Sequence, residues 1–325
     1  MVNFQTLAKI ELPQKYFDLA VRAAKQKADI SRNKVARAQP AKKAIYIETQ
    51  HIDTMNKVLH KHLERVLKEF PRLEQLSTFY RSLCDLRFSA REYHQTLGQL
   101  HWSLGKIQNL AGMTINRIQR SKTIKEAVDA RQSFYGRVAS ILNRMAETLR
   151  FLEQCRKTLR GFPDIQKGVF TACICGFPNV GKSTLLKKLT GANPEIANYA
   201  FTTKSLNTGT LTKGSVTIQL VDAPGTLNRE HKKMNKVEQE ADLAIHYAAD
   251  ILIYVLDPTE SYPLEDQEKL LRYVSSIGKP VLVYLSKTDI ADKQMIKQFN
   301  EKFKKDYVVV SLAELYTVLA EKGRK

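Results

Sequence analysis

The residues best suited to chemistry lie in a glycine-rich stretch, residues 176–184, which read Gly-Phe-Pro-Asn-Val-Gly-Lys-Ser-Thr. An apolar run precedes this stretch and a helix-like segment follows it. A strand that turns through glycine into a helix N-terminus directs backbone N–H groups and the positive end of the helix dipole at an anion. Lys182 would reach the β- and γ-phosphates of a nucleoside triphosphate, and the Ser183 hydroxyl would ligate Mg²⁺. The predicted phosphate ligands are Asn179, Val180, Gly181, Lys182, Ser183 and Thr184.

Two later segments supply groups that respond to the γ-phosphate. Residues 216–225 form an apolar run that ends in Asp222 and continues into Ala-Pro-Gly225. Asp222 would hold Mg²⁺ through a water, and the Gly225 N–H would bond the γ-phosphate. Between the loop and Asp222, either Thr202 or Thr203 would close over Mg²⁺ and the γ-phosphate, with Thr203 slightly favoured. The alternative is a surface Thr pair in a connector. Lys182, Thr203 and Gly225 are the expected catalytic groups.

A third segment selects the base. Residues 281–289 end in Ser286-Lys287-Thr-Asp289. A carboxylate at Asp289 can accept hydrogen bonds from N1–H and the exocyclic amine of guanine, whereas adenine has no such pair of donors. The order and spacing of the segments therefore favour GTP over ATP. A final apolar strand leads to a predicted small loop that would touch the base oxygen, comprising Ser311, Leu312 and Ala313.

These segments need a sheet to bring them together. After residue 163, short apolar runs alternate with amphipathic stretches. The alternation predicts a mostly parallel sheet with helices on both faces, over residues 163–325. The expected strands are 169–175, 216–221, 250–256, 280–285 and 307–310. The expected later helices are 264–277 and 293–303.

The first half of the chain shows helical periodicity instead. From Ile52 to Phe70, apolar residues recur every three or four positions until Pro71. A second run extends from Leu142 to Leu159, and residues 78–118 suit one or two more helices. Because strand signals are nearly absent before residue 169, we predict an all-α helical bundle over residues 1–162. Gly161-Phe-Pro-Asp is the expected junction.

Charge is concentrated in the helical half. The net charge is +19, and residues 1–160 hold 30 Lys and Arg against 14 Asp and Glu, whereas residues 161–325 hold 22 against 19. A field of this size favours a polyanionic partner, with nucleic acid ahead of an acidic membrane surface. Each basic cluster taken alone also fits a solvated helix face. The candidate RNA contacts are Arg32, Lys34, Arg37, Lys42, Lys43, Arg117, Arg120, Lys122 and Lys125.

Other classes of protein fit the sequence poorly. It has no apolar run of about 18 residues and no signal-peptide pattern at its start. The four cysteines lack zinc spacing, and Cys173 and Cys175 are expected to be small core residues. These features indicate a reducing, intracellular compartment.

The motifs resemble those of a known family. Residues 176–184, 199–205 and 222–225 resemble the Obg-type GTPases, and residues 69–80, 97–100 and 149–156 resemble the helical domain of the nucleolar GTP-binding (Nog) subfamily. The resemblance runs from roughly Leu12 to Ala313. It implies a Ras-like P-loop GTPase domain behind a helical domain that binds pre-ribosomal RNA during large-subunit assembly. Because the chain ends soon after residue 313, it looks like an archaeal, cytoplasmic form that is monomeric away from the ribosome.

Three positions affect nucleotide affinity or the rate of hydrolysis. The family's guanine motif begins with Asn, but Ser286 stands here, which could weaken nucleotide affinity by about 1–3 kcal/mol. Thr226 follows Gly225 and is too short to orient water as a Gln would, so slow hydrolysis is expected. Asn179 resembles the loop residue of relatives that bind K⁺, or it caps its own turn.

The sequence therefore predicts a partner-stimulated GTPase acting on large-subunit rRNA or a pre-ribosomal particle, with Mg²⁺ and a possible K⁺. The alternative is an RNA-binding assembly scaffold whose G domain binds nucleotide and barely hydrolyses it.

Overall fold

Two compact units make up the chain. The computed structural model describes residues 4–34, 39–191, 206–214, 216–223, 234–259 and 262–324. The helical unit comprises Val2–Gln75 and Arg87–Arg160, and the sheet unit comprises Leu76–Leu86 and Gly161–Lys325. The predicted fold class, a helical bundle followed by an α/β domain, is confirmed.

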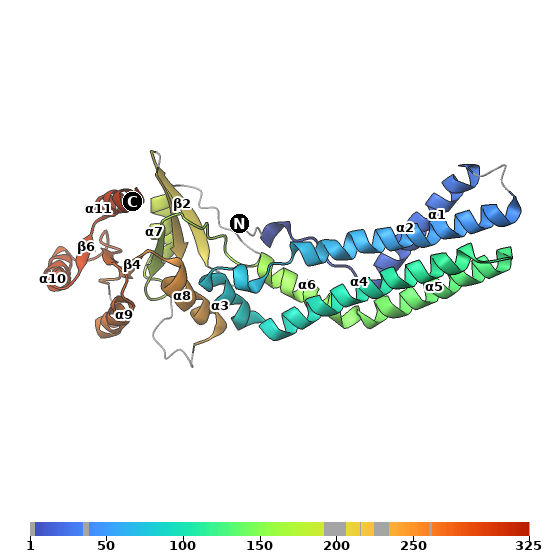
Figure 1. The fold of residues 1–325 in the computed structure, drawn as a ribbon. Helices are drawn as coiled ribbons and strands as arrows, with labels where there is room; N and C mark the ends of the chain where they lie inside the picture. The colour runs from blue at the N-terminus through green and yellow to red at the C-terminus, as the bar shows by residue number, and fades with distance from the viewer. Residues whose placement is uncertain are drawn as a thin grey trace. The chain divides into compact units, whose positions relative to one another are not determined.

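Long helices build the helical unit (Figure 1). Residues that favour helix ends stand at several of their termini. Ser89 and Thr123 cap two of them, each accepting a hydrogen bond from the amide of a Glu three residues later. Pro71, which lacks an N–H, follows the end of a third. The elements are the 3-10 turn η1 (Phe4–Thr6), α1 (Pro13–Lys34), α2 (Pro40–Glu69), the 3-10 turn η2 (Leu73–Gln75), α4 (Ala90–Gln119), α5 (Ile124–Arg144) and α6 (Ala146–Arg160).

The apolar stripe of α2 forms the centre of this unit. Ile52, Met55, Leu59 and Leu63 are at most 1% exposed, as their spacing predicts. Helix α2 packs against α1, α4 and α5, and α4 also packs against α5. The expected continuous helix across residues 142–159 is interrupted, because Met145 leaves the helical conformation between α5 and α6. Apolar periodicity continues through this break, since Leu142 and Leu149 are both buried.

The sheet unit has the strand order β2-β3-β1-β4-β5-β6 in its described residues. Strands β1, β3, β4, β5 and β6 pair in parallel, and β2 pairs antiparallel with β3. The strands are β1 (Thr171–Cys175), β2 (Asn207–Lys213), β3 (Val216–Asp222), β4 (Ile251–Leu256), β5 (Val281–Leu285) and β6 (Val308–Val310). The helices are α3 (Thr78–Arg87), α7 (Lys182–Thr190), α8 (Lys236–Leu243), the π-helix η4 (Ala244–Ala248), α9 (Leu264–Ser276), α10 (Lys293–Phe303) and α11 (Leu312–Lys322).

Side-chain contacts sort the helices of the sheet unit into two groups. The Tyr316 hydroxyl of α11 donates to the carbonyl of Lys188 in α7. On the other side, the Tyr273 hydroxyl of α9 donates to Asp242 of α8 at 2.7 Å, and Lys302 of α10 pairs with a carboxylate of α9. Right-handed crossovers place the helix after β1 and the helix after β4 on opposite faces, since the two connections run in opposite directions along the sheet.

Strand β2 is absent from the sequence prediction, because its residues, Asn-Thr-Gly-Thr-Leu-Thr-Lys, show little apolar character. Packing against α7 restricts the residue type at Gly209 of β2. A Cβ at Gly209 would lie 2.7 Å from Thr190 Cγ2, so the strand can approach the helix only with glycine there.

Helix α3 belongs to the sheet unit although its sequence lies within the expected N-terminal domain. The Tyr80 hydroxyl donates to the Pro163 carbonyl at 2.9 Å and accepts from the Ile165 amide at 2.8 Å. Gln219 of β3 holds the same connector, donating to the Asp164 carbonyl and accepting from the Gln166 amide at 3.0 Å. The expected boundary between residues 162 and 163 stays a prediction.

Buried cysteines occupy the strand that leads into the glycine-rich loop. Cys173 and Cys175 are fully buried, and burial raises the pKa of Cys175 to about 12. Among the described residues, no three His, Cys, Asp or Glu side chains gather as metal ligands. None of the helices in those residues combines the length and apolarity needed to cross a membrane.

We expect the stability of the helical unit to fall as pH is lowered from about 7.5 to about 5. Burial, followed by the charge of Arg131, lowers the pKa of His51 to about 4. The unfolded chain takes up a proton near the ordinary value of about 6.5, so protonation favours unfolding in this window and costs about 2 kcal/mol. Urea unfolding followed by fluorescence of Trp102, the single Trp, measures the change. His51→Asn should flatten the pH dependence; an unchanged slope in that variant would assign the effect to other groups.

Candidate nucleotide-binding site

The glycine-rich loop joins the buried strand β1 to helix α7. All five residues of β1 are buried between β3 and β4, which fixes where the strand ends. Gly176 then adopts φ +141°, and a Cβ at this position would lie 2.7 Å from the Val255 carbonyl oxygen. Gly181 adopts a left-handed conformation at the N-terminus of α7. The predicted strand–turn–helix geometry of an anion-binding loop is therefore present.

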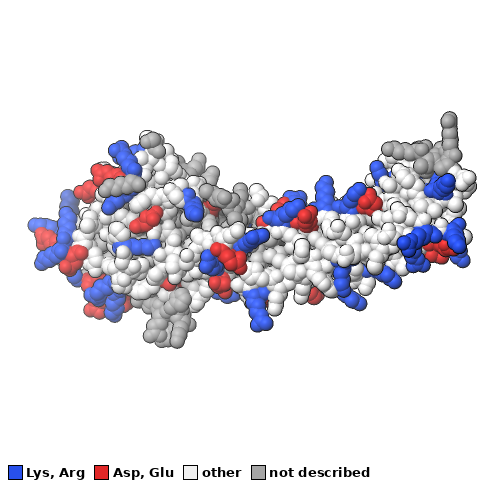
Figure 2. All heavy atoms as spheres, viewed as in Figure 1, with Lys and Arg blue, Asp and Glu red and all other residues white. Residues whose placement is uncertain are grey.

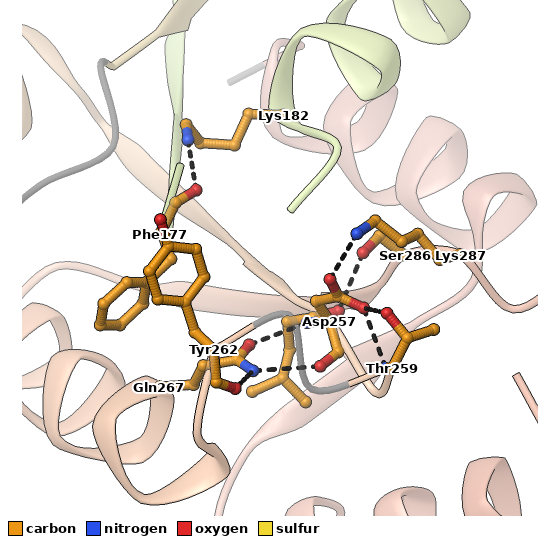
Figure 3. Close-up of polar contacts among 9 residues, drawn as sticks. Phe177, Lys182, Asp257, Thr259, Tyr262, Gln267, Ser286 and Lys287 are labelled. Atoms are coloured by element: carbon orange, nitrogen blue, oxygen red, sulfur yellow. Dashed lines mark hydrogen bonds and ion pairs between the residues drawn. The ribbon is translucent and has the colours of Figure 1, made fainter. Parts of the chain in front are cut away.

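Lys182 is buried at the start of α7 and its ammonium points back along the loop (Figure 3). Its Nζ donates to the Phe177 carbonyl oxygen at 2.6 Å. Burial lowers the pKa of Lys182, and the nearby Asp222 carboxylate opposes that shift. An ammonium held within the loop by a neutral carbonyl can exchange that partner for a phosphate oxygen, which binds it more strongly because it is charged.

Asp222 ends β3 opposite the helix residue Ser183. The Ser183 hydroxyl donates to Asp222 Oδ2 at 2.6 Å, and Asn207 Nδ2 of β2 approaches the same oxygen at 3.5 Å. The other oxygen, Oδ1, is buried without a hydrogen-bond partner in the described residues. Burial raises the pKa of Asp222, against the Ser183 hydrogen bond and the charge of Lys182. A hydroxyl and a carboxylate with an unsatisfied oxygen suit a hard divalent cation, so these residues fit Mg²⁺.

The predicted base-binding motif follows β5 at the same edge of the sheet. The Ser286 hydroxyl donates to the Leu256 carbonyl at 3.1 Å and therefore bonds the neighbouring strand. A Cβ at Gly181 would lie 3.5 Å from Ser286 Cβ, so this residue backs onto the phosphate loop. Asp289 is exposed, as a carboxylate that binds a base must be.

Parallel pairing brings these predicted residues together. Ile174 lies opposite Asp222 in the register of β1 and β3, and Leu256 lies opposite Leu285 in that of β4 and β5. The carboxyl ends of β1, β3, β4 and β5 consequently meet at one edge, where α/β proteins bind ligands. Thr202, Thr203, Gly225 and Thr226 lie outside the described residues.

Three predicted contacts have a different local structure from the one expected. Ser311 caps α11 through reciprocal hydrogen bonds with Glu314, so Leu312 and Ala313 form the first turn of a helix instead of a loop. The Ser-x-x-Glu spacing of a capping box could have revealed this in the sequence. Any contact of these residues with the base stays a prediction. Val180 is fully buried, which leaves only its backbone for phosphate binding.

Asp257 and Gln267 are the main polar residues of this edge that sequence reasoning missed. Asp257 follows β4, is fully buried, and pairs with Lys287 Nζ at 2.6 Å. A carboxylate directly after an apolar parallel strand was a readable signal, because Asp222 occupies the same kind of position. Gln267 is buried on α9, and nothing in its sequence context distinguishes it from an exposed helical residue.

Four of the predicted RNA contacts are exposed at one end of the helical unit. Arg117, Arg120, Lys122 and Lys125 gather around the turn between α4 and α5. An open hollow of about 570 Å³ lies there, lined by Met113, Asn116, Arg117, Arg120, Ser121 and Glu126.

The other basic cluster is less well defined. Arg32 pairs with Asp29 at 2.8 Å, Lys42 is exposed and Lys43 is half-buried. Arg37 and the side chain of Lys34 lie outside the described part of the chain. Figure 2 shows basic side chains along the helices with acidic ones between them, and no continuous basic patch on the face in view.

Comparison with known proteins decides the family. Residues 4–166 match the model of the NOG1 N-terminal helical domain, which covers half of the chain. The chain belongs to the NOG1 family. Residues 171–287 match a model described as a 50S ribosome-binding GTPase, so the sheet unit of this NOG1-family chain is a GTPase domain. The resemblance drawn from the motifs is thus confirmed.

Individual relatives differ in how much of their length the chain spans. An uncharacterized protein of Methanocaldococcus jannaschii is 32% identical, over 90% of this chain and 83% of its own length. Nucleolar GTP-binding protein 1 of Drosophila melanogaster is 31% identical, over 74% of this chain but 38% of its own length. The cytosolic domain of the T. maritima FeoB iron transporter in apo form covers 48% of this chain and 64% of its own, with 26% identity and a TM-score of 0.40. That score supports no conclusion about this chain.

We predict opposite effects for two Gly→Ala substitutions. Gly176→Ala forces a Cβ against the Val255 carbonyl at an unfavourable φ and should destabilise the sheet unit by about 2–3 kcal/mol, with loss of GTP affinity. Gly105→Ala is the matched control on α4, where a Cβ would meet nothing within 4 Å, and should stabilise its helix by up to about 1 kcal/mol. Urea unfolding followed by far-UV circular dichroism, with GTP titration, measures both. Equal effects would contradict the loop geometry.

Proposed function

We propose that this chain is a slow, partner-stimulated GTPase that docks on large-subunit rRNA and leaves the assembling particle when GTP is hydrolysed. The observation that carries the proposal is the convergence of Lys182, Ser183 and Asp222 with the Ser286–Asp289 turn at one sheet edge. The matching family is described as a ribosome-binding GTPase and the fly relative as a nucleolar GTP-binding protein, and both descriptions support the choice of partner.

Different residues of the chain would bind the phosphates, the magnesium ion and the base. Lys182 would leave the Phe177 carbonyl and donate to the β- and γ-phosphate oxygens, and backbone N–H groups of residues 179–184 would bind the same phosphates. Ser183 and Asp222 would hold Mg²⁺, which neutralises the charge that develops on the phosphates. Asp289 would accept from guanine. Thr203 and Gly225 would close on the γ-phosphate. Water would attack the γ-phosphorus as the bond to the bridging oxygen of GDP breaks, and both residues would open once inorganic phosphate has left.

We expect slow turnover because a threonine, Thr226, follows Gly225. Thr226 cannot orient water as a longer amide side chain would, so an activating partner or a cation is needed. Asn179 supports a K⁺ hypothesis, because its side chain is exposed on a backbone at φ +60°. We propose that K⁺ binds there and that the ribosomal particle raises the rate.

Docking would use the helical unit. The exposed residues Arg117, Arg120, Lys122 and Lys125 offer phosphate contacts around one turn, and contacts of this kind position RNA without reading its sequence. We further propose that the chain is cytoplasmic and monomeric away from the particle. The alternative, a scaffold that binds nucleotide and barely hydrolyses it, draws support from Ser286, whose hydroxyl bonds its own neighbouring strand.

Turnover measurements test the proposal. We expect GTP to be hydrolysed in preference to ATP, faster in K⁺ than in Na⁺, and at least about tenfold faster with large-subunit particles. Lys182→Ala should abolish stimulated turnover and block particle maturation, whereas Lys187→Ala, an exposed lysine one turn further along α7, should change neither. If Lys182→Ala docks and supports maturation, GTP hydrolysis does not govern docking and the switch proposal is wrong. A particle that leaves the rate unchanged refutes partner stimulation.

A further inference from the structure

The loop between β4 and α9 contacts both ends of the nucleotide site. We define the β4–α9 brace as Asp257, Thr259, Tyr262 and Gln267, which Figure 3 shows between the phosphate loop and Lys287. None of these residues belongs to the phosphate-binding or base-binding motifs. Their contacts with those motifs are short, specific and largely buried, which raises the question of what they position.

Asp257 holds the lysine of the base-binding motif. One carboxylate oxygen accepts from Lys287 Nζ at 2.6 Å, and the other accepts from the Thr259 amide at 2.9 Å and the Thr259 hydroxyl at 2.6 Å. The carboxylate is fully buried while Lys287 is about a quarter exposed. Removing one partner of such a pair leaves an uncompensated buried charge, so Lys287 is strongly fixed.

Lys287 in turn defines the turn that carries Asp289. It is a non-glycine residue at φ +51°, a conformation that needs support from its surroundings. Its carbonyl accepts from the amides of Ile290 and Ala291, both at 3.2 Å, and so closes the turn around Asp289. The position of the Asp289 carboxylate therefore depends on the conformation that the Asp257–Lys287 pair maintains.

Gln267 fixes the brace by bonding the loop backbone on both sides. Its Oε1 accepts from the Asp257 amide at 2.9 Å, and its Nε2 donates to the carbonyls of Asp257 at 3.1 Å and Tyr262 at 2.9 Å. The carbonyl of Gln267 itself accepts from the Tyr254 hydroxyl at 2.7 Å. Because buried backbone groups need hydrogen-bond partners, the fully buried Gln267 amide fixes the backbone of Asp257 and Tyr262.

The brace also reaches the phosphate loop. The Tyr262 ring packs on the Phe177 ring, with centroids 4.7 Å apart, and the Phe177 carbonyl is the group that holds Lys182. The brace thus contacts both motifs, through the Asp257–Lys287 ion pair and through the ring contact of Tyr262 with Phe177.

We propose that Asp257 is a positioning residue for guanine recognition: through Lys287 it sets the turn that presents Asp289, a task that the short side chain of Ser286 leaves to the brace. This inference rests on the proposed role of Asp289 as the guanine ligand. It predicts that Asp257 affects the choice of base more than the binding of phosphates.

The test compares GDP with inosine diphosphate, which lacks the exocyclic amine, and with inorganic tripolyphosphate, which lacks the base. We expect the wild-type chain to prefer GDP to inosine diphosphate by about tenfold or more, the value of one charged hydrogen bond. Asp257→Asn should reduce that preference to within about threefold and leave tripolyphosphate affinity nearly unchanged. Isothermal titration calorimetry gives all three affinities, and thermal unfolding with tripolyphosphate confirms that the variant is folded.

A double-mutant cycle separates positioning from general stability. Lys287→Gln, at a partly exposed position, should lower the base preference as Asp257→Asn does, and the double variant should lose no more than either single one. Glu268→Gln is the control, because Glu268 follows Gln267 on α9 but pairs with Lys302 of α10 and, among the described residues, with no brace residue, and the variant should keep the full preference.

The possible failures are distinguishable. A wild-type chain without preference for GDP would refute Asp289 as the guanine ligand, and the inference with it. A wild-type preference that survives in both Asp257→Asn and Lys287→Gln would overturn the inference alone, as would additive losses in the double variant.

Discussion

The pairing of β1 between β3 and β4 is the constraint on which the site depends. It buries β1 completely and ends three neighbouring strands at one edge, so that Lys182, Asp222 and Asp257 are buried there. Buried charges are costly unless they are paired or hydrogen-bonded. Each finds a partner on another segment: Lys182 on the loop carbonyl, Asp222 on Ser183, and Asp257 on Lys287. The buried charges at the strand ends are therefore held by short polar contacts beside the proposed nucleotide site.

The groups proposed to bind phosphate and magnesium already lie together at this edge of the sheet. Lys182 needs only to exchange one acceptor for another, and the unsatisfied Oδ1 of Asp222 is already buried at the edge. Preorganisation of this kind lowers the cost of binding and favours charge that develops during reaction. Among the described residues, none is proposed to activate water, so the rate is assigned to a partner.

Sequence reasoning recovered the parts of the molecule that follow from local pattern. Periodicity predicted the core of α2 and five of the strands, and motif spacing predicted that Ser183 and Asp222 serve one site, where the structure places the Ser183 hydroxyl 2.6 Å from Asp222 Oδ2. The features that the sequence did not predict depend on tertiary contacts. Glycine is required at position 209 because α7 lies beside β2, and Gln267 is buried because its amide bonds surrounding backbone groups. The break at Met145 was hidden because the apolar repeat continues across it. Asp257 and the Ser311 cap were readable signals that were overlooked.

Strand β3 links residues 164–166 to Asp222, the proposed magnesium ligand. Gln219 of β3 bonds residues 164 and 166, three positions before Asp222 on the same strand. Control of docking by nucleotide state can be measured as the dissociation constant for large-subunit particles, with a non-hydrolysable GTP analogue and with GDP. We expect binding at least about tenfold tighter with the analogue. Equal constants for the two nucleotides would contradict it.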